Sequence, residues 1–303
     1  MRIRDDRPLQ MPSPKRFLAI DVARGLAIFL VIFAHSLEIF MNRPSVGPDL
    51  FEIWKAIYSF HIPLFFFLSG FVSQPHGPKE RLTRALTLIL MTMICDVAAW
   101  GLQRVLGQTQ GQGDFLLNQL GLYHQTLIVT WFLPALALIQ ILDQGLHHPN
   151  RIIRWASGIV LLLAPAFHLN THLDIFQSGA LFPGWLFFSL GRCLSRRHFL
   201  QEAFEIAKGR LHRSFLFLFF AVWLDQLNLG CLLNPMASCP NLGSHFAVFL
   251  IHGEVGFPPY FFLAALAGSL SLLEVSVFLA ARLPRIARTI GLWGEKSLVL
   301  LIA

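Results

Sequence analysis

The sequence predicts an all-α fold, a polytopic bundle of helices in a membrane. Three observations lead to this prediction. The chain of 303 residues is 55% hydrophobic and only 14% charged, whereas a soluble protein carries about 25% charged residues. Its apolar runs are long enough to cross the hydrocarbon core of a bilayer, which is about 30 Å thick. Basic residues gather in short segments between these runs, as they do in the cytoplasmic loops of membrane proteins.

We expect about eight complete spans and a ninth that is truncated by the end of the chain. The complete spans are predicted at residues 18–40, 56–73, 85–105, 119–142, 155–169, 180–194, 214–230 and 258–281, and the ninth apolar segment begins near residue 292. The fifth and sixth segments are short for a full crossing, so each is either tilted differently or partly re-entrant. We therefore expect a polar cytoplasmic segment, 1–17, and one transmembrane domain, 18–303.

The basic residues orient this bundle. If the N-terminus is cytoplasmic, most Lys and Arg residues lie on the same side, and the opposite side holds little more than Arg43, Lys55 and Arg104. The first apolar run is too long for the core of a signal peptide and lacks a small-residue cleavage site, so we expect it to be retained. The net charge of +7 then follows from membrane topology, and nucleic acid is not expected as a partner.

The first span carries two ionisable residues that are costly in hydrocarbon, Arg24 and His35. Residues 24 to 35 of an α-helix make about three turns and about 16 Å, so both side chains leave the same face. A neutral imidazole accepts a proton at physiological pH, which makes His35 a candidate general base for a hydroxyl nucleophile. The alternative is a histidine that forms a hydrogen bond across helices.

Two acidic residues accompany this pair on the first span. Asp21 precedes Arg24 by three residues, so Arg24 either forms an ion pair within the helix or binds an anionic ligand from the cytoplasm, for which its forked guanidinium is suited. Glu38 follows His35 by three residues, where it either orients the imidazole ring or lies at the outer boundary of the membrane. We favour the boundary interpretation for Glu38.

The second span reads YSFHIPLFFFLSGFV. His61 precedes Pro63 at its outer end, where proline is tolerated in the first turn of a helix. The phenylalanine run 65–67 is expected to pack or to contact lipid. Ser69 and Gly70 offer a small surface on which another helix can approach closely.

A basic loop, PHGPKERLTR, leads into the third span. If the helix begins there, Arg81 and Arg84 share one face and form a second anion clamp at the cytoplasmic side. The alternative is that these arginines only follow the positive-inside rule. In the fourth span, Trp131 of TWFLPAL is expected to pack, and Pro134 to bend the helix. Asp225, in the seventh span, is either functional or paired with a buried polar group.

These segments together resemble one family. IDVARGLAIFLVIFAHS, FHIPLFFFLSGFV, RLTR, TWFLPAL and the final GLWGEKSLVLLIA are similar to the motifs of the acyltransferase type 3 family, which are integral-membrane acyltransferases. The segment FHIPLFFFLSG looks most like the corresponding sequences of the subgroup of fucose 4-O-acetylase-like proteins. The resemblance is good over the first half of the chain and, in the second half, covers only the hydropathy and the GEKSL segment.

The resemblance implies an O-acyltransferase in the bacterial cytoplasmic (inner) membrane. It would move an acyl group, most often acetyl, from acyl-CoA to a hydroxyl of an extracytoplasmic glycan or lipid-linked sugar. His35 would be the catalytic histidine and Arg24 its required partner, and Arg81 and Arg84 would help to hold the CoA phosphates. Further candidate supporting residues are Asp21, Glu38, His61, Ser69 and Trp131. Acyl-CoA enters this scheme as a donor substrate, and we expect no permanently bound cofactor and no metal.

The residues themselves agree with such a donor. CoA is a polyanion at one end and a thioester at the other, so a basic cytoplasmic mouth with a base about three helical turns deeper would hold both ends. The main rival is a membrane transporter or flippase of a glycan or small anionic substrate, with a buried Arg and His that serve passage or proton coupling. A catalytically inactive relative is the second rival, because family members usually continue through a complete final span and this chain ends at Ala303.

Overall fold

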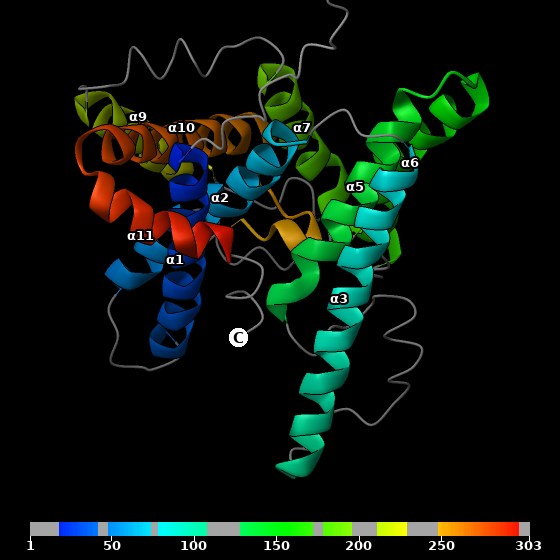
Figure 1. Ribbon diagram of the computed structural model, residues 1–303, viewed down its shortest axis with the longest axis horizontal. Coiled ribbons are helices and arrows are strands. Elements are labelled where there is room, and N and C mark those ends of the chain that lie inside the picture. Colours follow the sequence, from blue (N-terminus) through cyan, green and yellow to red (C-terminus); the bar gives the residue numbers. More distant parts are fainter. Residues whose placement is uncertain are drawn as a thin grey trace, which may run out of the picture.

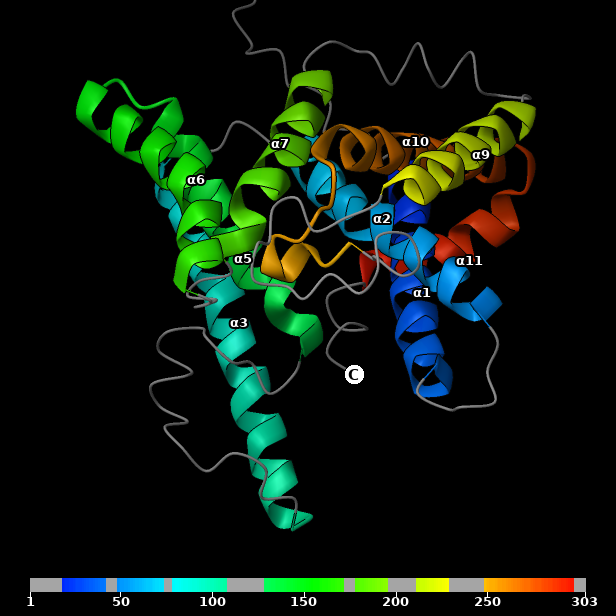
Figure 2. The same cartoon turned by 180° about the vertical axis from the view of Figure 1, so that it is seen from behind.

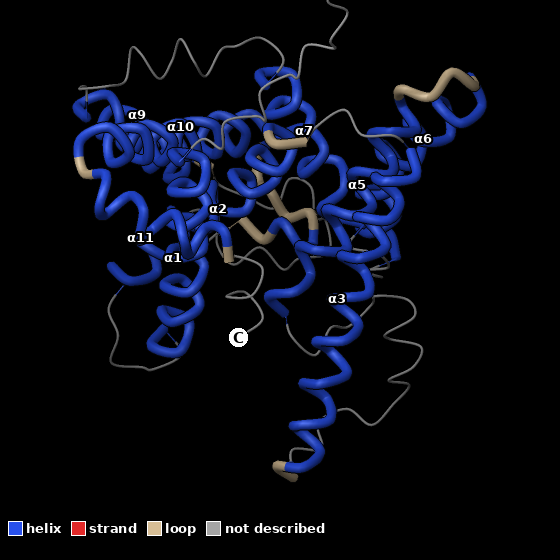
Figure 3. Tube along the Cα trace, viewed as in Figure 1, coloured by secondary structure: helices blue, strands red, loops and turns tan. Residues whose placement is uncertain are grey.

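The computed structural model describes residues 18–41, 48–73, 78–107, 128–171, 178–195, 211–228 and 248–296. Within these stretches the secondary structure is helical, apart from turns and one isolated β-bridge (Figure 3). The all-α prediction is therefore confirmed. Four described helices are long and apolar enough to cross a membrane, over Leu18–Glu38, Leu50–Phe71, Lys79–Val105 and Pro258–Arg282. The expected count of eight complete spans stays a prediction.

The described α-helices keep the labels of Figure 1, and η denotes a 3-10 helix, which the figure does not label. In chain order they are α1 (Leu18–Met41), α2 (Pro48–Phe71), α3 (Pro78–Val105), η1 (Ile128–Trp131), α5 (Phe132–Leu146), α6 (Arg151–Thr171), α7 (Ser178–Ser195), α9 (Leu211–Leu227), η3 (Leu250–His252), α10 (Pro258–Arg282) and α11 (Pro284–Glu295). The expected cytoplasmic segment 1–17 lies outside the described residues.

The predicted start of the second span is wrong. The sequence predicts this span from residue 56, but α2 begins at Pro48 and Lys55 lies buried inside it instead of in an outer loop. The charged residues near the start of α2 lower the local hydropathy, so a hydropathy pattern does not detect this part of the helix. Packing against other helices shields the lysine from lipid and water. Pro63 consequently lies inside the helix and not in its first turn, where it removes one backbone hydrogen bond.

One later boundary also differs from the prediction, and one helix was not predicted. The fourth span is predicted over 119–142, whereas the described helix α5 extends to Leu146 and follows the 3-10 turn η1; residues 119–127 lie outside the described residues. The ninth apolar segment, predicted from near residue 292, lies mostly outside the described residues, which end at residue 296. Helix α11, which begins at Pro284, precedes this segment and was not predicted. The arginines of α11 lower its hydropathy, so a hydropathy pattern assigns this segment to a loop. In the structure they alternate with apolar residues along an amphipathic helix.

Helix α2 occupies the centre of the described bundle. It packs against α1, α7 and α10, while α9 lies along α10 and α11 lies along α1 (Figure 1). On the far side of α7, helices α3, α5 and α6 form a second group, and the lower part of α3 extends away from the other helices in both views (Figure 2). The exposed side of α3 carries Leu82, Leu86, Leu90 and Ile94, a spacing that places an apolar stripe towards lipid.

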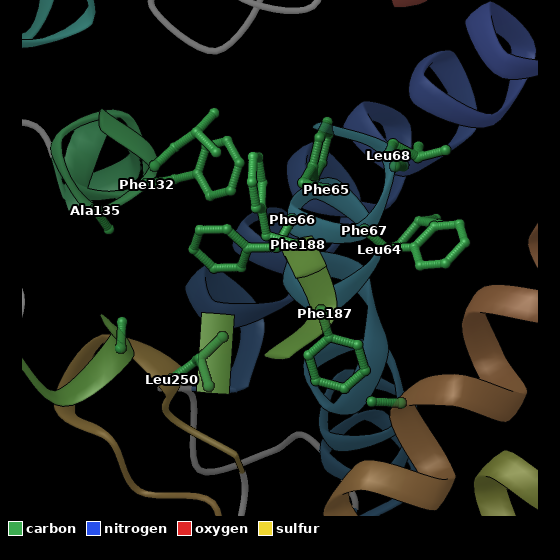
Figure 4. Packing of buried hydrophobic residues seen from close by; sticks show 14 of the residues in the cluster. Leu64, Phe65, Phe66, Phe67, Leu68, Phe132, Ala135, Phe187, Phe188 and Leu250 are labelled. Carbon is green, nitrogen blue, oxygen red and sulfur yellow. The ribbon is translucent and has the colours of Figure 1, made fainter. Parts of the chain in front are cut away.

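The phenylalanine run of α2 forms the middle of the hydrophobic core. Phe66 is fully buried, and its ring lies 4.7 Å from that of Phe132 on α5. Figure 4 shows Phe65, Phe66 and Phe188 between α2, α5 and α7. The packing interpretation of this run is therefore confirmed.

Small residues let the helices come together, as predicted for Gly70. A methyl group added at Gly70 would collide with the backbone oxygen of Phe188 on α7, and one at Gly294 of α11 would collide with the backbone oxygen of Asp21 on α1. Such contacts replace the hydrophobic driving force that is missing between helices in lipid. They fix α2 against α7 and α11 against the first half of α1.

Candidate functional site

His35 lies in the second half of α1 and keeps a partly open side chain. Its exposed fraction is 31%, and its Nδ1 atom lies 3.1 Å from Oε2 of Glu38. An ionised carboxylate only accepts hydrogen bonds, so Nδ1 carries the hydrogen and Nε2 is left with its lone pair. The pair therefore has the arrangement of a general base held in one tautomer by an acidic partner.

The Glu38 carboxylate also receives hydrogen bonds from the start of α2. Trp54 Nε1 donates to Oε1 of Glu38 over 3.0 Å, and the Tyr58 hydroxyl donates to the same oxygen. We call His35, Glu38, Trp54 and Tyr58 the His35 cluster. These contacts support the alternative in which Glu38 orients the imidazole ring over the boundary interpretation that we favoured. The position of Glu38 relative to the membrane surface stays a prediction.

Aromatic rings surround this carboxylate. The rings of Trp54 and Tyr58 lie 4.3 Å apart, and both contact Phe249, at 5.5 and 5.9 Å. The ring of Tyr58 also meets His35 edge-on at 6.1 Å. The polar centre of the cluster is therefore lined by rings from α2 and from the segment before α10, while the His35 and Glu38 side chains stay 31% and 36% exposed.

His61 lies one step further along the same face of α2. It is 2% exposed, and its Nδ1 atom is 2.8 Å from the backbone oxygen of Ile57, to which it donates a hydrogen bond. Its ring packs edge-on against Tyr58 with 4.9 Å between the centroids. The described contacts of His61 hold the ring of Tyr58 in place. A direct catalytic role for His61 stays a prediction.

Arg24 and Asp21 lie in the first half of α1, where α11 packs. Asp21 is buried and Arg24 is half-buried. Both belong to the same helix as His35, so the single-helix arrangement of the two predicted site residues is retained. The roles predicted for them, an ion pair or an anion ligand, stay predictions.

The RLTR pair lies on a different part of the molecule. Arg81 is half-buried and Arg84 is exposed in the first turns of α3. This helix packs on α5, and both ribbon views show it on the opposite side of α7 from α1 (Figures 1 and 2). The described structure thus does not place Arg81 and Arg84 beside Arg24.

Two further predicted residues take part in packing. Trp131 is 7% exposed and belongs to the main hydrophobic core, where its ring meets Phe132 edge-on at 6.4 Å. Its expected packing is confirmed. Ser69 is half-buried next to Gly70, at the contact of α2 with α7.

Sequence reasoning missed two members of the His35 cluster, Trp54 and Tyr58. They precede His61 at the spacing i, i+4 and i+7, which puts all three on one face of a helix. That spacing was an available signal once α2 was known to begin before residue 54. The missing information was the tertiary contact with Glu38.

Two buried ion pairs have partners that the sequence did not predict. Asp225 of α9, expected to be functional or paired, lies 3.9 Å from Lys55 of α2. Asp143 of α5 accepts hydrogen bonds from Arg192 and Trp185 of α7. Each pair joins helices that are far apart in the sequence, so no local sequence pattern predicts it.

Comparisons with known proteins agree with the sequence motifs. The family model described as "Acyltransferase domain" matches residues 17–294. The chain is similar to a Nodulation protein NolL of Mesorhizobium japonicum, with 31% identity over 159 residues, and to a Nodulation protein NolL of Sinorhizobium fredii, with 27% identity over 163 residues. Each match covers 50% of this chain and 42% or 43% of the relative, so the chain spans less than half of the length of these relatives. No solved structure matches significantly.

Proposed function

Because the chain belongs to the acyltransferase type 3 family, whose model covers residues 17–294, we propose that it is a membrane O-acyltransferase. The donor is cytoplasmic acyl-CoA, with acetyl as the expected group, and the acceptor is a hydroxyl of an extracytoplasmic glycan. The hydrogen bond between His35 and Glu38 is the observation that carries the proposal. It leaves one basic nitrogen on a partly open side chain, which is what activation of a hydroxyl requires.

In the proposed reaction the sugar hydroxyl attacks the thioester directly. His35 Nε2 removes the hydroxyl proton while the oxygen forms a bond to the carbonyl carbon. The tetrahedral intermediate then collapses, the carbon–sulfur bond breaks, and the sulfur leaves with the electron pair. The thiolate takes the proton back from Nε2, which releases CoA as the free thiol. The negative charge of Glu38 stabilises the imidazolium between these two transfers.

We assign the CoA phosphates to Arg24, Arg81 and Arg84. Although α1 and α3 are not packed together, CoA carries phosphates on its ribose and in its diphosphate bridge, so separate arginines can bind separate groups. A phosphate held by Arg24 is about three helical turns from His35, a span that the pantetheine arm covers. The chain is proposed to lie in the bacterial cytoplasmic membrane with its N-terminus cytoplasmic, as the distribution of basic residues indicates.

The test is acyl transfer by the full chain in membranes. We would measure radiolabelled acetyl transfer and the release of free CoA thiol, with acetyl-CoA as donor and methyl fucoside as acceptor probe. His35→Ala is expected to lower the rate by about 10²- to 10⁴-fold, the usual contribution of a general base. His212→Ala, which removes an exposed histidine of α9, is the matched control and should leave the rate unchanged.

Three outcomes would count against the proposal. Full activity in His35→Ala at equal membrane abundance would remove the assigned role of this residue. Equal losses in His35→Ala and His212→Ala would point to a general effect of histidine replacement. Movement of the fucoside across vesicles without any thiol release would favour a transporter.

A further inference from the structure

We propose that Phe249 forms the acceptor subsite of this protein, in which its ring stacks on the apolar face of a pyranose and directs one of the hydroxyls of the sugar towards His35. The inference rests on the proposed acyltransferase function and adds a residue that binds the acceptor.

Phe249 is presented by a tight turn just before α10. Its backbone N–H donates to the carbonyl oxygen of Glu254 over 2.9 Å, and the N–H of Glu254 donates back to Phe249 over 3.1 Å. Gly253 closes the turn with a φ of 70°, a conformation that side-chain-bearing residues rarely adopt. This geometry fixes the backbone from which the Phe249 ring projects.

The turn is anchored on both sides of Phe249. Val248 and Leu250, its immediate neighbours, are buried, and Leu250 belongs to the main core (Figure 4). Asn228, which is 1% exposed, donates to the carbonyl oxygen of Val255 over 3.0 Å and accepts from the N–H of Phe257 over 2.7 Å. Phe249 is nevertheless 36% exposed. Phe249 is therefore exposed although the segment that carries it is fixed by packing and hydrogen bonds.

The exposed ring leads directly to the proposed base. Phe249 contacts Trp54 and Tyr58, whose polar atoms hold Glu38, and Glu38 holds His35. The ring of Tyr58 lies 5.9 Å from that of Phe249 and 6.1 Å from that of His35, so it connects the proposed subsite with the partly exposed imidazole. An aromatic wall that ends in a few convergent polar groups is the usual form of a small-molecule site.

This combination fits a sugar better than a lipid chain. A pyranose has an apolar C–H face that packs on an aromatic ring and hydroxyls that reach polar groups at its edge. An acyl chain at the same place would bring hydrocarbon against the Glu38 carboxylate and the imidazole, which is costly. The class of ligand inferred here is therefore a hydroxyl-bearing ring.

The experiment separates the acceptor from the donor. KM values for methyl fucoside and for acetyl-CoA would be measured for the full chain and for Phe249→Ala and Phe249→Trp. Phe249→Ala is expected to raise the KM for the fucoside about tenfold, with less than a twofold change in the KM for acetyl-CoA. Phe249→Trp, which keeps an aromatic face, should recover most of the loss. Phe257→Ala is the matched control, because this exposed ring pairs with Tyr260 and stands in the same segment.

Equal KM values for the fucoside in Phe249→Ala and the unaltered protein would overturn the proposal. So would equal shifts in Phe249→Ala and Phe257→Ala, or a parallel rise in both KM values. If the unaltered protein releases no CoA thiol, the acyltransferase proposal fails first. Saturation-transfer NMR with methyl fucoside then tests the subsite alone: a signal lost in Phe249→Ala and retained in Phe257→Ala supports it, and an equal signal in all three refutes it.

Discussion

The carboxylate of Glu38 is the point where α1 and α2 exchange hydrogen bonds beside His35. It receives the imidazole N–H from its own helix and the Trp54 and Tyr58 donors from the next. Each donor is retained only if Glu38 stays in place, so the orientation of the base depends on two helices. A charged acceptor with three donors is also less costly within a membrane bundle than a bare carboxylate.

Replacing Glu38 by glutamine tests this arrangement. Glu38→Gln keeps the shape but removes the negative charge that stabilises the imidazolium, so we expect kcat to fall by at least about tenfold. The KM for acetyl-CoA should change far less, because the donor does not contact Glu38 in the proposed scheme. Initial-rate kinetics with acetyl-CoA check both values.

Glu52→Gln is the matched control. This glutamate lies on α2 and bonds with Gln226 of α9, a hydrogen bond that a glutamine can keep. Unchanged kinetics are expected for Glu52→Gln. A Glu38→Gln enzyme with the kcat of the unaltered protein would mean that Glu38 only fills space beside the ring.

At the level of helices, α11 holds the first half of α1. Its buried face consists of Ala287, Gly291 and Gly294, and Gly25 of α1 lies against the backbone of Ile290. The two backbones are in contact at Asp21 and Gly25 of α1, on either side of Arg24 in the sequence. Any displacement of α11 would therefore move the helix that carries both Arg24 and His35.

A single methyl group at this contact should be enough to disturb it. Gly294→Ala would place its new carbon against the backbone oxygen of Asp21, and overpacking of this kind costs about 1–3 kcal/mol. We expect a lower melting temperature in detergent and a lower acyl-transfer rate. Thermal unfolding monitored by tryptophan fluorescence provides the measurement.

Gly101→Ala on α3 supplies the comparison. The position of its new carbon is open, because no atom from elsewhere in the described residues lies within 4 Å of it, and alanine is the better helix former by about 1 kcal/mol. The stability of Gly101→Ala should therefore stay equal or rise. If both variants had the same melting temperature, the tight contact between α1 and α11 would not contribute to the stability of the protein.

For the whole molecule, the orientation of the bundle remains the prediction that connects all the others. Cys193 is exposed in the last turn of α7, next to basic residues that we assign to the cytoplasm. A membrane-impermeant maleimide should label Cys193 in inside-out vesicles and not in right-side-out vesicles, in a chain whose other cysteines are replaced by serine. The positive-inside rule is the reason for this expectation.

A cysteine at the opposite side completes this test. Leu106→Cys, combined with Cys193→Ser, places a thiol at the exposed turn after α3. This position should be labelled in right-side-out vesicles alone. The reverse pattern at both positions would invert the proposed topology and place the Arg24 end outside.

Sequence patterns predicted the parts of this molecule that depend on one helix at a time. The shared face of Arg24 and His35 follows from the helical period, and the packing of the phenylalanine run follows from its hydropathy. The buried pair of Lys55 and Asp225 could not be predicted in this way, because a charge looks unsuitable for a span until its partner on a distant helix is known. The contact of Trp54 and Tyr58 with Glu38 depends on tertiary packing for the same reason.

The packing of α11 on α1 has a consequence for synthesis in the cell. The ribosome delivers α1 to the membrane first, and α11 is the last described helix to leave it. The helix with the proposed catalytic histidine must therefore wait in the bilayer, without the partner that packs on its first half, while the intervening helices are inserted. Closure of this contact is a late event, so the proposed site reaches its final form only after translation has passed Gly294.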